Sequence, residues 1–330
     1  MKAPLISVIF PIYNGSMYLR EAIESIRAQT FTDYEIIIID DGSTDDSFQI
    51  IRSITDKRIR AYRQRNRGLA ATLNHGISLA RGRYLARMDQ DDLALPTRLE
   101  KQVAFLEGHA RCALLGTAAE IWIGDQKTDR MHDHPIDNLS LKFELMFDNY
   151  FVHSSVMFRK TAVEDIGGYT TDTARQPPED YELWSRLARK HEVANLSERL
   201  LVYREVAASM SRVTAANPFL DKLVLISSEN IAYELGTEIS ADIVDLSALV
   251  HSADNYLSRH PNIKNICHIV KKLGQKISNG SSTDVIERSE ARIELLKYKY
   301  TLYHPEADPY RTFIRILKGI KRRIGLNSVL

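Results

Sequence analysis

The first hundred residues of the chain alternate short apolar runs with longer segments in which apolar residues recur every three or four positions. The four isoleucines at 36–39 are typical of a strand covered on both faces, whereas the spacing at 19–26 places apolar residues on one face of a helix. Strands and helices that alternate with short connections form parallel sheets, so we predict a mostly parallel open α/β sheet flanked by helices. The predicted strands are 5–10, 34–39, 59–63 and 84–88, and the predicted helices are 16–29, 45–54 and 68–80.

Three carboxylates, Asp89, Asp91 and Asp92, follow the strand predicted at 84–88. A buried strand does not hold unpaired charge, so we expect them beyond its carboxyl end, facing a cleft. Carboxylates this close repel one another unless a cation lies between them, and oxygen-only ligands favour Mg²⁺ or Mn²⁺ shared with a phosphate-bearing ligand. The alternative is that the acids only stabilise the start of a helix predicted at 96–106.

A second acidic strand end, formed by Asp40 and Asp41, favours the ligand site. It follows the four isoleucines and precedes Gly42, which permits a tight turn. Ser43, with Asp46 three residues later, is typical of a capping box that starts a helix. Ligands of open α/β sheets bind at the carboxyl ends of the strands, so two acidic ends at one rim are more specific than either alone.

Composition narrows the class of protein. The chain has 330 residues, a net charge of +1, 44% apolar and 26% charged residues, which is ordinary for a soluble globular protein and gives no basic field for nucleic acid. Its two cysteines, Cys112 and Cys267, fit no metal-binding spacing and suit a reducing compartment. We expect a cytoplasmic protein, since no signal peptide precedes the first strand and no apolar run approaches the ~20 residues that span a bilayer. The first strand is followed by neither GxGxxG nor a P-loop, which argues against dinucleotide-binding Rossmann and P-loop enzymes.

Five motifs, in the expected order, resemble glycosyltransferase family 2. They lie at 7–14 together with 29–31 and 40–45, at 66–69, at 74–76, at 89–92 and at 176–184. The resemblance covers roughly residues 4–206. It implies a GT-A fold, a nucleotide-sugar donor, a divalent cation and inversion at the anomeric carbon.

The resemblance also implies which residues contact the nucleotide. Asp41 would accept hydrogen bonds from the nucleobase, and Asp89 would contact the ribose or base side of the nucleotide. Asp91 would bind the Mn²⁺ or Mg²⁺ ion that bridges the diphosphate. The wall around the base would be formed by Pro11, Tyr13 and Asn14.

Three further candidates each have two interpretations. Arg67 either meets the diphosphate or is a solvated loop arginine. Asp92 either supports the metal site or contacts the donor sugar. His153, in the segment 151–159 that resembles an acceptor-side strand, either approaches a sugar or is a structural histidine.

Glu179 and Asp180 are the candidates for the catalytic base. The prolines at 177 and 178 enforce an extended approach, and the apolar spacing at 181–187 predicts a helix, so both acids would lie at a helix N-terminus. Acids in a first helical turn often only stabilise it. The family resemblance selects Asp180 as the general base, with Glu179 as an orienting or acceptor-hydroxyl contact.

The C-terminal part carries no chemical motif. We predict a GT-A domain at 1–216, with a nucleotide-binding half at 1–107 and an acceptor half at 108–216, followed by a helical region at 217–330. The last segment, 309–326, combines an apolar helical stripe with a basic face, which is typical of helices that lie on anionic membranes. A helix docked on its own domain, or a dimer contact, is the alternative.

Together these features predict an inverting, metal-assisted glycosyltransferase that moves a sugar from a nucleotide-sugar donor to a hydroxyl of a glycan or lipid-linked acceptor. By resemblance the donor is a UDP-sugar, with dTDP and GDP as alternatives, and the setting is surface-polysaccharide assembly at the cytoplasmic face of a bacterial membrane. A sugar-nucleotide nucleotidyltransferase is a second hypothesis, although the glycine-rich basic loop of that class is missing after the first strand. A non-catalytic nucleotide-sugar-binding protein is a third, and a binding module would not need Asp180.

Overall fold

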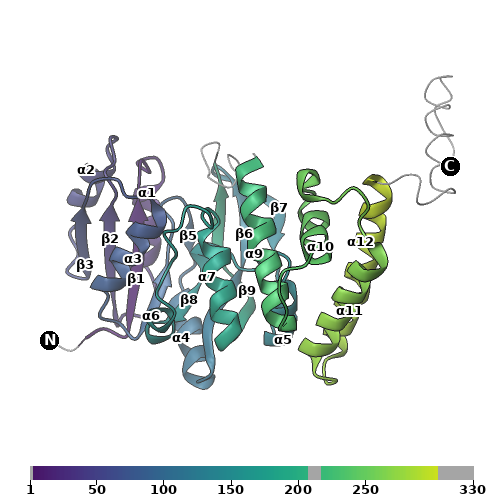
Figure 1. Ribbon diagram of the computed structural model, residues 1–330. Helices are drawn as coiled ribbons and strands as arrows, with labels where there is room; N and C mark the ends of the chain where they lie inside the picture. Colours follow the sequence, from purple (N-terminus) through teal and green to yellow (C-terminus); the bar gives the residue numbers. More distant parts are fainter. Residues whose placement is uncertain (1–2, 207–216, 304–330) are drawn as a thin grey trace, which may run out of the picture. The chain divides into compact units, whose positions relative to one another are not determined.

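The computed structural model describes residues 3–206 and 217–303 (Figure 1). The chain divides into two compact units after Asn230, within helix α9 (Asn217–Leu235). The predicted domain boundary between residues 216 and 217 stays a prediction. All the residues predicted for the functional site belong to the first unit.

The first unit begins with the alternation that the sequence predicts. Strands β3, β2, β1 and β4 lie side by side in this order, and every pair is parallel. The strands are β1 (Ile6–Ile12), β2 (Tyr34–Asp40), β3 (Ile59–Arg63) and β4 (Tyr84–Arg87), and the helices between them are α1 (Leu19–Arg27), α2 (Ser47–Ser53) and α3 (Leu69–Leu79). These seven elements confirm the predicted ones to within a few residues at each end.

Beyond β4 the sheet is mixed, with antiparallel pairs as well as one further parallel pair, and this mixed part was not predicted. Strand β8 (Met157–Arg159) is antiparallel to β4 and to β6 (Cys112–Ile123), and β9 (Glu192–Glu205) is parallel to β6. Strands β5 (Leu93–Ala94) and β7 (Gln126–His132) add antiparallel pairs to β9 and β6. The remaining elements of this unit are α4 (Arg98–Gly108), α5 (Asn138–Glu144), the 3₁₀ turn η1 (His153–Ser155), α6 (Lys160–Asp165), α7 (Glu179–Lys190) and the part of α9 up to Asn230.

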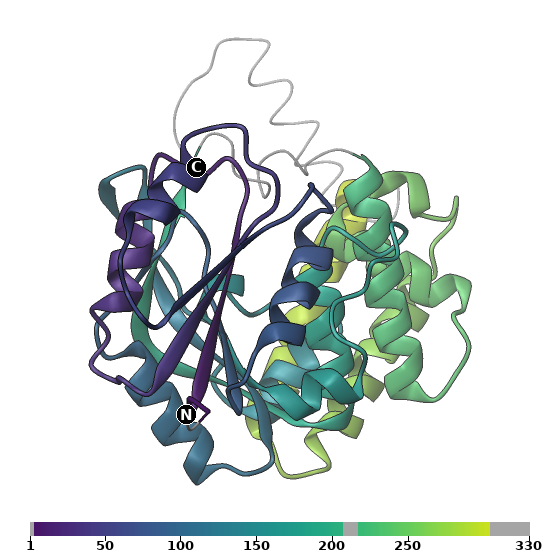
Figure 2. The same ribbon diagram turned by 90° about the vertical axis from the view of Figure 1, so that its left-hand side faces the viewer.

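Both faces of the sheet are covered by helices, which explains the run of four isoleucines. Ile36 and Ile38 pack in a core with residues of α1 and α4, whereas Ile37 and Ile39 pack in a second core with residues of α3 and α7. All four side chains are fully buried. Figure 2 shows the sheet between these two helical layers. Alternate residues of a strand point to opposite faces, so a strand buried on both faces has no polar positions.

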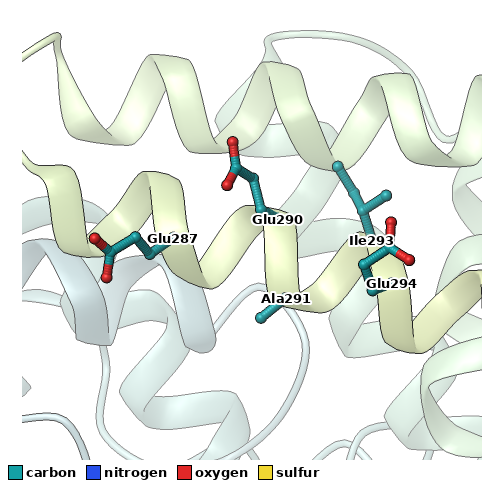
Figure 3. A pocket seen from close by; sticks show the side chains of 5 residues that line it. All are labelled: Glu287, Glu290, Ala291, Ile293 and Glu294. Atoms are coloured by element: carbon teal, nitrogen blue, oxygen red, sulfur yellow. The ribbon is translucent and has the colours of Figure 1, made fainter.

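The second unit is helical, as predicted for the part of 217–330 that the structure describes. It contains the end of α9, α10 (Ala241–His251), the 3₁₀ turn η2 (Asp254–Tyr256), α11 (Ile263–Ser278) and α12 (Thr283–Tyr303). None of the helices formed by the described residues is long and apolar enough to cross a membrane. A surface hollow of about 470 Å³ is lined by five residues of α12, none of them a predicted site residue (Figure 3). The predicted basic helix at 309–326 lies outside the described residues.

A buried carboxylate on β2 gives the first testable consequence of this fold. Glu35 is 3% exposed and accepts hydrogen bonds from Ser7, Arg60 and Arg81 at 2.6–3.0 Å. Burial alone would raise its pKa, but the bonds from Arg81, Arg60 and Ser7 outweigh it and lower the pKa of Glu35 to about 2. The ionised carboxylate therefore stabilises the fold at neutral pH, and this contribution is lost as the pH falls from about 4.5 towards 2.

We expect Glu35→Gln to lower the free energy of unfolding at pH 7 by about 2 kcal/mol, because both arginines lose their charged partner. Urea unfolding at pH 7 and pH 3 measures the effect, which should shrink at the lower pH. Glu164→Gln is a matched control, because Glu164 forms an exposed 3.5 Å pair with Lys160 that contributes little. Equal losses in the two variants would contradict the prediction.

Candidate active site at the carboxyl ends of β1, β2 and β4

The loops that follow β1, β2 and β4 are joined by hydrogen bonds between their main chains and polar side chains. Tyr13 and Gln90 exchange two bonds, from the Tyr13 N–H to Gln90 Oε1 (2.8 Å) and from Gln90 Nε2 to the Tyr13 carbonyl (3.0 Å). Asn14, with φ of 49°, donates its N–H to Ser43 Oγ (3.0 Å) and accepts from the Thr44 N–H (2.8 Å). The two acidic strand ends therefore meet at one rim, as predicted. Ser43 does not cap α2: its hydroxyl accepts from Asn14, and the helix begins only at Ser47.

Asp41 orders the loop at 64–68, which forms one side of this rim. Its carboxylate accepts hydrogen bonds from Gln64 Nε2 (2.7 Å) and from the N–H groups of Arg67 (2.9 Å) and Gly68 (2.9 Å). A Cβ at Gly42, where φ is 82°, would lie 2.9 Å from the Asn66 nitrogen, so only glycine lets this loop come so close. The predicted hydrogen bond from a nucleobase to Asp41 stays a prediction.

The residues predicted to form the wall around the nucleobase differ in their exposure to solvent. Pro11 is buried in β1, whereas Tyr13 is 48% exposed and Asn14 is exposed. The Arg67 side chain is also exposed, and its contact with a diphosphate stays a prediction. An exposed aromatic ring at the rim is available for stacking on a base.

The carboxylates of Asp89, Asp91 and Asp92 lie together, with one oxygen of each within 4.8 Å of the others. Asp92 is buried and accepts hydrogen bonds from the Ser154 hydroxyl and from the Arg204 N–H (2.8 Å). Asp89 forms an ion pair with Arg87. The Asp91 carboxylate has no hydrogen bond or ion pair with another of the described residues. Both oxygens of Asp92 have protein partners, which favours its supporting role, and its sugar contact stays a prediction.

The electrostatics of this cluster fit a hard divalent cation. Burial, followed by the charge of Asp89, raises the pKa of Asp91 to about 7, and the same two causes together with Asp91 raise the pKa of Asp92 well above its usual range. Like charges held this close require either protons or a cation. Asp91 offers the free oxygen ligand, and Asp89 lies beside it, so the donor set suits Mg²⁺ or Mn²⁺.

Arg204, near the end of β9, fixes the main chain of the acidic loop. Its N–H binds Asp92, its Nη1 donates to the Asp91 carbonyl (3.0 Å), and its Nη2 pairs with Glu21 (3.0 Å). The guanidinium also lies over the Tyr18 ring, 4.0 Å from its centroid. Sequence analysis gave Arg204 no site role, because its partners are 112 and 113 residues away along the chain.

Helix α7 begins at Glu179, as predicted, and both acids of the predicted base lie in its first turn. Asp180 accepts hydrogen bonds from Asn149 Nδ2 (2.8 Å) and from the Tyr181 N–H (2.7 Å), and burial raises its pKa. Burial and the charge of Asp180 raise the pKa of Glu179 to about 7. Burial thus favours the protonated form of both acids, and Glu179 is poised to exchange a proton near neutral pH.

The turn η1 lies between the acidic loop and Glu179, the first residue of α7. Ser154 donates to Asp92, and the neighbouring His153 places Nδ1 3.9 Å from Glu179 and binds Tyr169 Oη through Nε2 (2.9 Å). The His153 ring also packs edge-on against the fully buried Trp184. Burial and the charge of Arg87 hold the pKa of His153 well below its usual range. A buried neutral histidine between protein partners fits the structural interpretation, and its sugar contact stays a prediction.

The site also contains residues that sequence analysis missed. Arg87, Asn149 and Tyr169 all lie among the predicted site residues. One feature of the sequence could have identified Arg87, because it is a charged residue inside an otherwise apolar strand. The roles of Asn149 and Tyr169 depend on contacts between segments far apart in the chain.

Comparison with known proteins identifies the family. Residues 7–167 match the model of glycosyl transferase family 2. The chain is 36% identical over 216 residues to EpsE of Bacillus subtilis, named a glycosyltransferase, and the match covers 63% of this chain and 76% of EpsE. The chain belongs to glycosyltransferase family 2. The amylovoran biosynthesis glycosyltransferase AmsE of Erwinia amylovora is another relative in the family, 32% identical over 206 residues, with 61% of this chain and 76% of AmsE covered.

Solved structures confirm the predicted fold. The crystal structure of S. aureus TarS residues 1–349 in complex with UDP-GlcNAc is similar with a TM-score of 0.61 at 16% sequence identity, covering 91% of this chain and 92% of TarS. The chain therefore has the GT-A-like fold and is a glycosyltransferase, which confirms the predicted enzyme class.

Proposed function

We propose that this glycosyltransferase moves a sugar from a nucleotide-sugar donor to a hydroxyl of a glycan or lipid-linked acceptor, with inversion and with Asp180 as the general base. The observation that carries the proposal is the turn η1, in which Ser154 donates to Asp92 of the acidic loop and the adjacent residue, His153, lies 3.9 Å from Glu179 of α7. One rim thus holds both a site suited to a diphosphate leaving group and a proton acceptor. TarS was solved with UDP-GlcNAc, so UDP-sugars are the first donors to test.

On the donor side, the exposed Tyr13 ring stacks on the base in this proposal, with Pro11 and Asn14 beside it, and Asp41 fixes the loop at 64–68. Asp91, next to Asp89, would hold Mg²⁺ or Mn²⁺, which supplies positive charge for the diphosphate leaving group when bound. Asp89 contacts the ribose or base side of the nucleotide, and Arg67 and Asp92 stay candidates for the diphosphate and the donor sugar. Ser154 and Arg204 keep this loop in place through Asp92.

On the acceptor side, Asp180 removes the proton of the acceptor hydroxyl as that oxygen attacks the anomeric carbon. The new carbon–oxygen bond forms opposite the breaking bond to the diphosphate, which inverts the configuration. Asn149 and the Tyr181 N–H hold the Asp180 carboxylate, and Glu179 orients the acceptor hydroxyl.

The cellular setting is also part of the proposal. The relative AmsE is named for amylovoran biosynthesis, which supports a role in assembling a surface polysaccharide. A cytoplasmic location with peripheral membrane contact through 309–326 follows from the sequence prediction for that basic segment.

Ligand-dependent stabilisation tests the donor site. We expect one family of nucleoside diphosphates or nucleotide sugars, with Mn²⁺, to raise the free energy of unfolding by about 2.7 kcal/mol at a hundredfold excess over Kd. Thermal unfolding with UDP-, dTDP- and GDP-sugars, each with and without Mn²⁺, measures this, and uridine without a diphosphate is the ligand control. A folded sample that none of these ligands stabilises would contradict the proposed donor site.

A further inference from the structure

Arg87 is a buried cation inside an otherwise apolar strand. Its residue is 2% exposed, and it lies opposite Ile9 in the parallel pair of β1 and β4. Leu85, two positions earlier, belongs to the core formed with α3 and α7, so Arg87 points to the same face. This face carries η1 and the start of α7. Burying an unpaired guanidinium costs several kcal/mol, so its place requires an explanation.

The guanidinium is only partly paired by the protein. Asp89 forms an ion pair with Nη1, and the buried Nε has no hydrogen-bond partner. Two other buried arginines near the cluster differ, because Arg98 donates to the Arg87 carbonyl (2.8 Å) and Arg204 to the Asp91 carbonyl (3.0 Å). Those two hold the main chain of the loop. Arg87 makes no such bond, so local scaffolding does not account for it.

The charges around Arg87 come from both sides of the site. Asp89 and Asp91 follow it on the acidic loop, and Glu179 and Asp180 face it from α7. The positive charge of Arg87 lowers the pKa of Glu179 and Asp180 against the opposing effect of burial. The remaining titratable groups that it faces are Asp92, Arg98, His153 and Tyr169.

We propose that Arg87 is a positioning residue that serves as the internal counter-ion of the acidic site, fixing the Asp89 carboxylate and supplying the positive charge that faces Glu179 and Asp180. The inference rests on the proposed function, because it assigns Arg87 a role in the same reaction. Arg87 then has two effects of opposite sign. It weakens the binding of a free divalent cation by charge repulsion, and it favours transfer by holding the Asp89 carboxylate in place.

Direct Mn²⁺ binding to the full chain, measured without nucleotide by the electron paramagnetic resonance of the free ion, tests this directly. We expect Arg87→Gln to bind Mn²⁺ about tenfold more tightly than the wild type, because a nearby positive charge has been removed. The same variant should transfer sugar about tenfold more slowly, because Asp89 is no longer held. Arg87→Lys keeps the charge and should restore the wild-type Mn²⁺ affinity.

Arg159→Gln is the matched control. It removes the charge of a partly buried arginine whose partners are the main-chain carbonyls of Cys112 (2.9 Å) and Leu106 (2.6 Å), and should leave Mn²⁺ affinity and transfer unchanged. Wild-type or weaker Mn²⁺ binding by Arg87→Gln would overturn the role of Arg87 and leave the proposed function intact. Absence of Mn²⁺ binding and transfer in the wild type would instead overturn the proposed function.

The apolar variant Arg87→Met repeats the test if the glutamine variant does not fold. If neither folds at pH 7, Arg87 is needed for the fold itself, and the proposed role is overturned.

Discussion

Asp180→Asn is expected to lower the rate of sugar transfer about 10³-fold, because an amide cannot take the proton of the acceptor hydroxyl. The substitution keeps the shape of the side chain, and its carbonyl oxygen can still accept the 2.8 Å hydrogen bond from Asn149. Donor affinity should therefore stay within about twofold of the wild type, since Asp180 acts on the acceptor side. Initial rates together with calorimetric titration of the donor nucleotide separate the two effects.

Glu182→Gln, on the same helix, is the control for this variant. Glu182 pairs with Arg186 at 2.7 Å and has no proposed contact with substrate, so its loss should affect stability and leave transfer nearly unchanged. Normal transfer by Asp180→Asn would contradict the assignment of Asp180 as the general base. Glu179, whose pKa is about 7, would then be the candidate. The rate should fall as the pH drops below the raised pKa of the base, because only the ionised carboxylate accepts a proton.

Asp91→Asn should abolish the response of the protein to Mn²⁺ and lower transfer by about 10³-fold, which corresponds to a loss of about 4 kcal/mol of transition-state stabilisation. The substitution should not lower the stability of the fold. Asp91 has no hydrogen-bond or ion-pair partner among the described residues, and its ionised form is disfavoured by burial and by Asp89.

The sign of the stability change follows from the raised pKa of Asp91, which is about 7 in the folded protein and 3.8 for the unperturbed group. The folded protein holds the proton more tightly, so this group makes the metal-free protein less stable as the pH rises from about 4 to 7. Asp91→Asn should therefore raise the thermal midpoint at pH 8 without metal. A manganese response that survives in Asp91→Asn would contradict the assignment.

Sequence patterns predicted the parts of this fold that depend on neighbouring residues. The isoleucines at 36–39 identified β2, and the prolines at 177 and 178 placed the start of α7 at Glu179. The mixed half of the sheet was not predicted, because the pairing of β8 with β4 and with β6 joins segments that are far apart in the chain. Ser43 was expected to cap a helix, but its hydroxyl accepts a bond from Asn14, 29 residues away.

The residues of the candidate site likewise fall into those that local patterns predict and those that they do not. Asp91, Glu179 and Asp180 were found because acids at strand and helix ends leave a local pattern, which the family resemblance then sharpened. The partners that hold these acids leave no such pattern. Asn149 is 31 residues from Asp180, and Ser154 is 62 residues from Asp92, so only the folded chain reveals them.

The turn η1 has a geometric consequence for the two sides of the site. Ser154 holds the donor-side loop and the adjacent His153 faces the acceptor-side helix, so two contact points on opposite sides of the reaction are one peptide unit apart. Consecutive Cα atoms are about 3.8 Å apart, and this spacing is set by covalent bonds that no side-chain repacking alters. The turn therefore couples the placement of the acidic loop to that of the first turn of α7, so a change that shifts one of them is expected to shift the other.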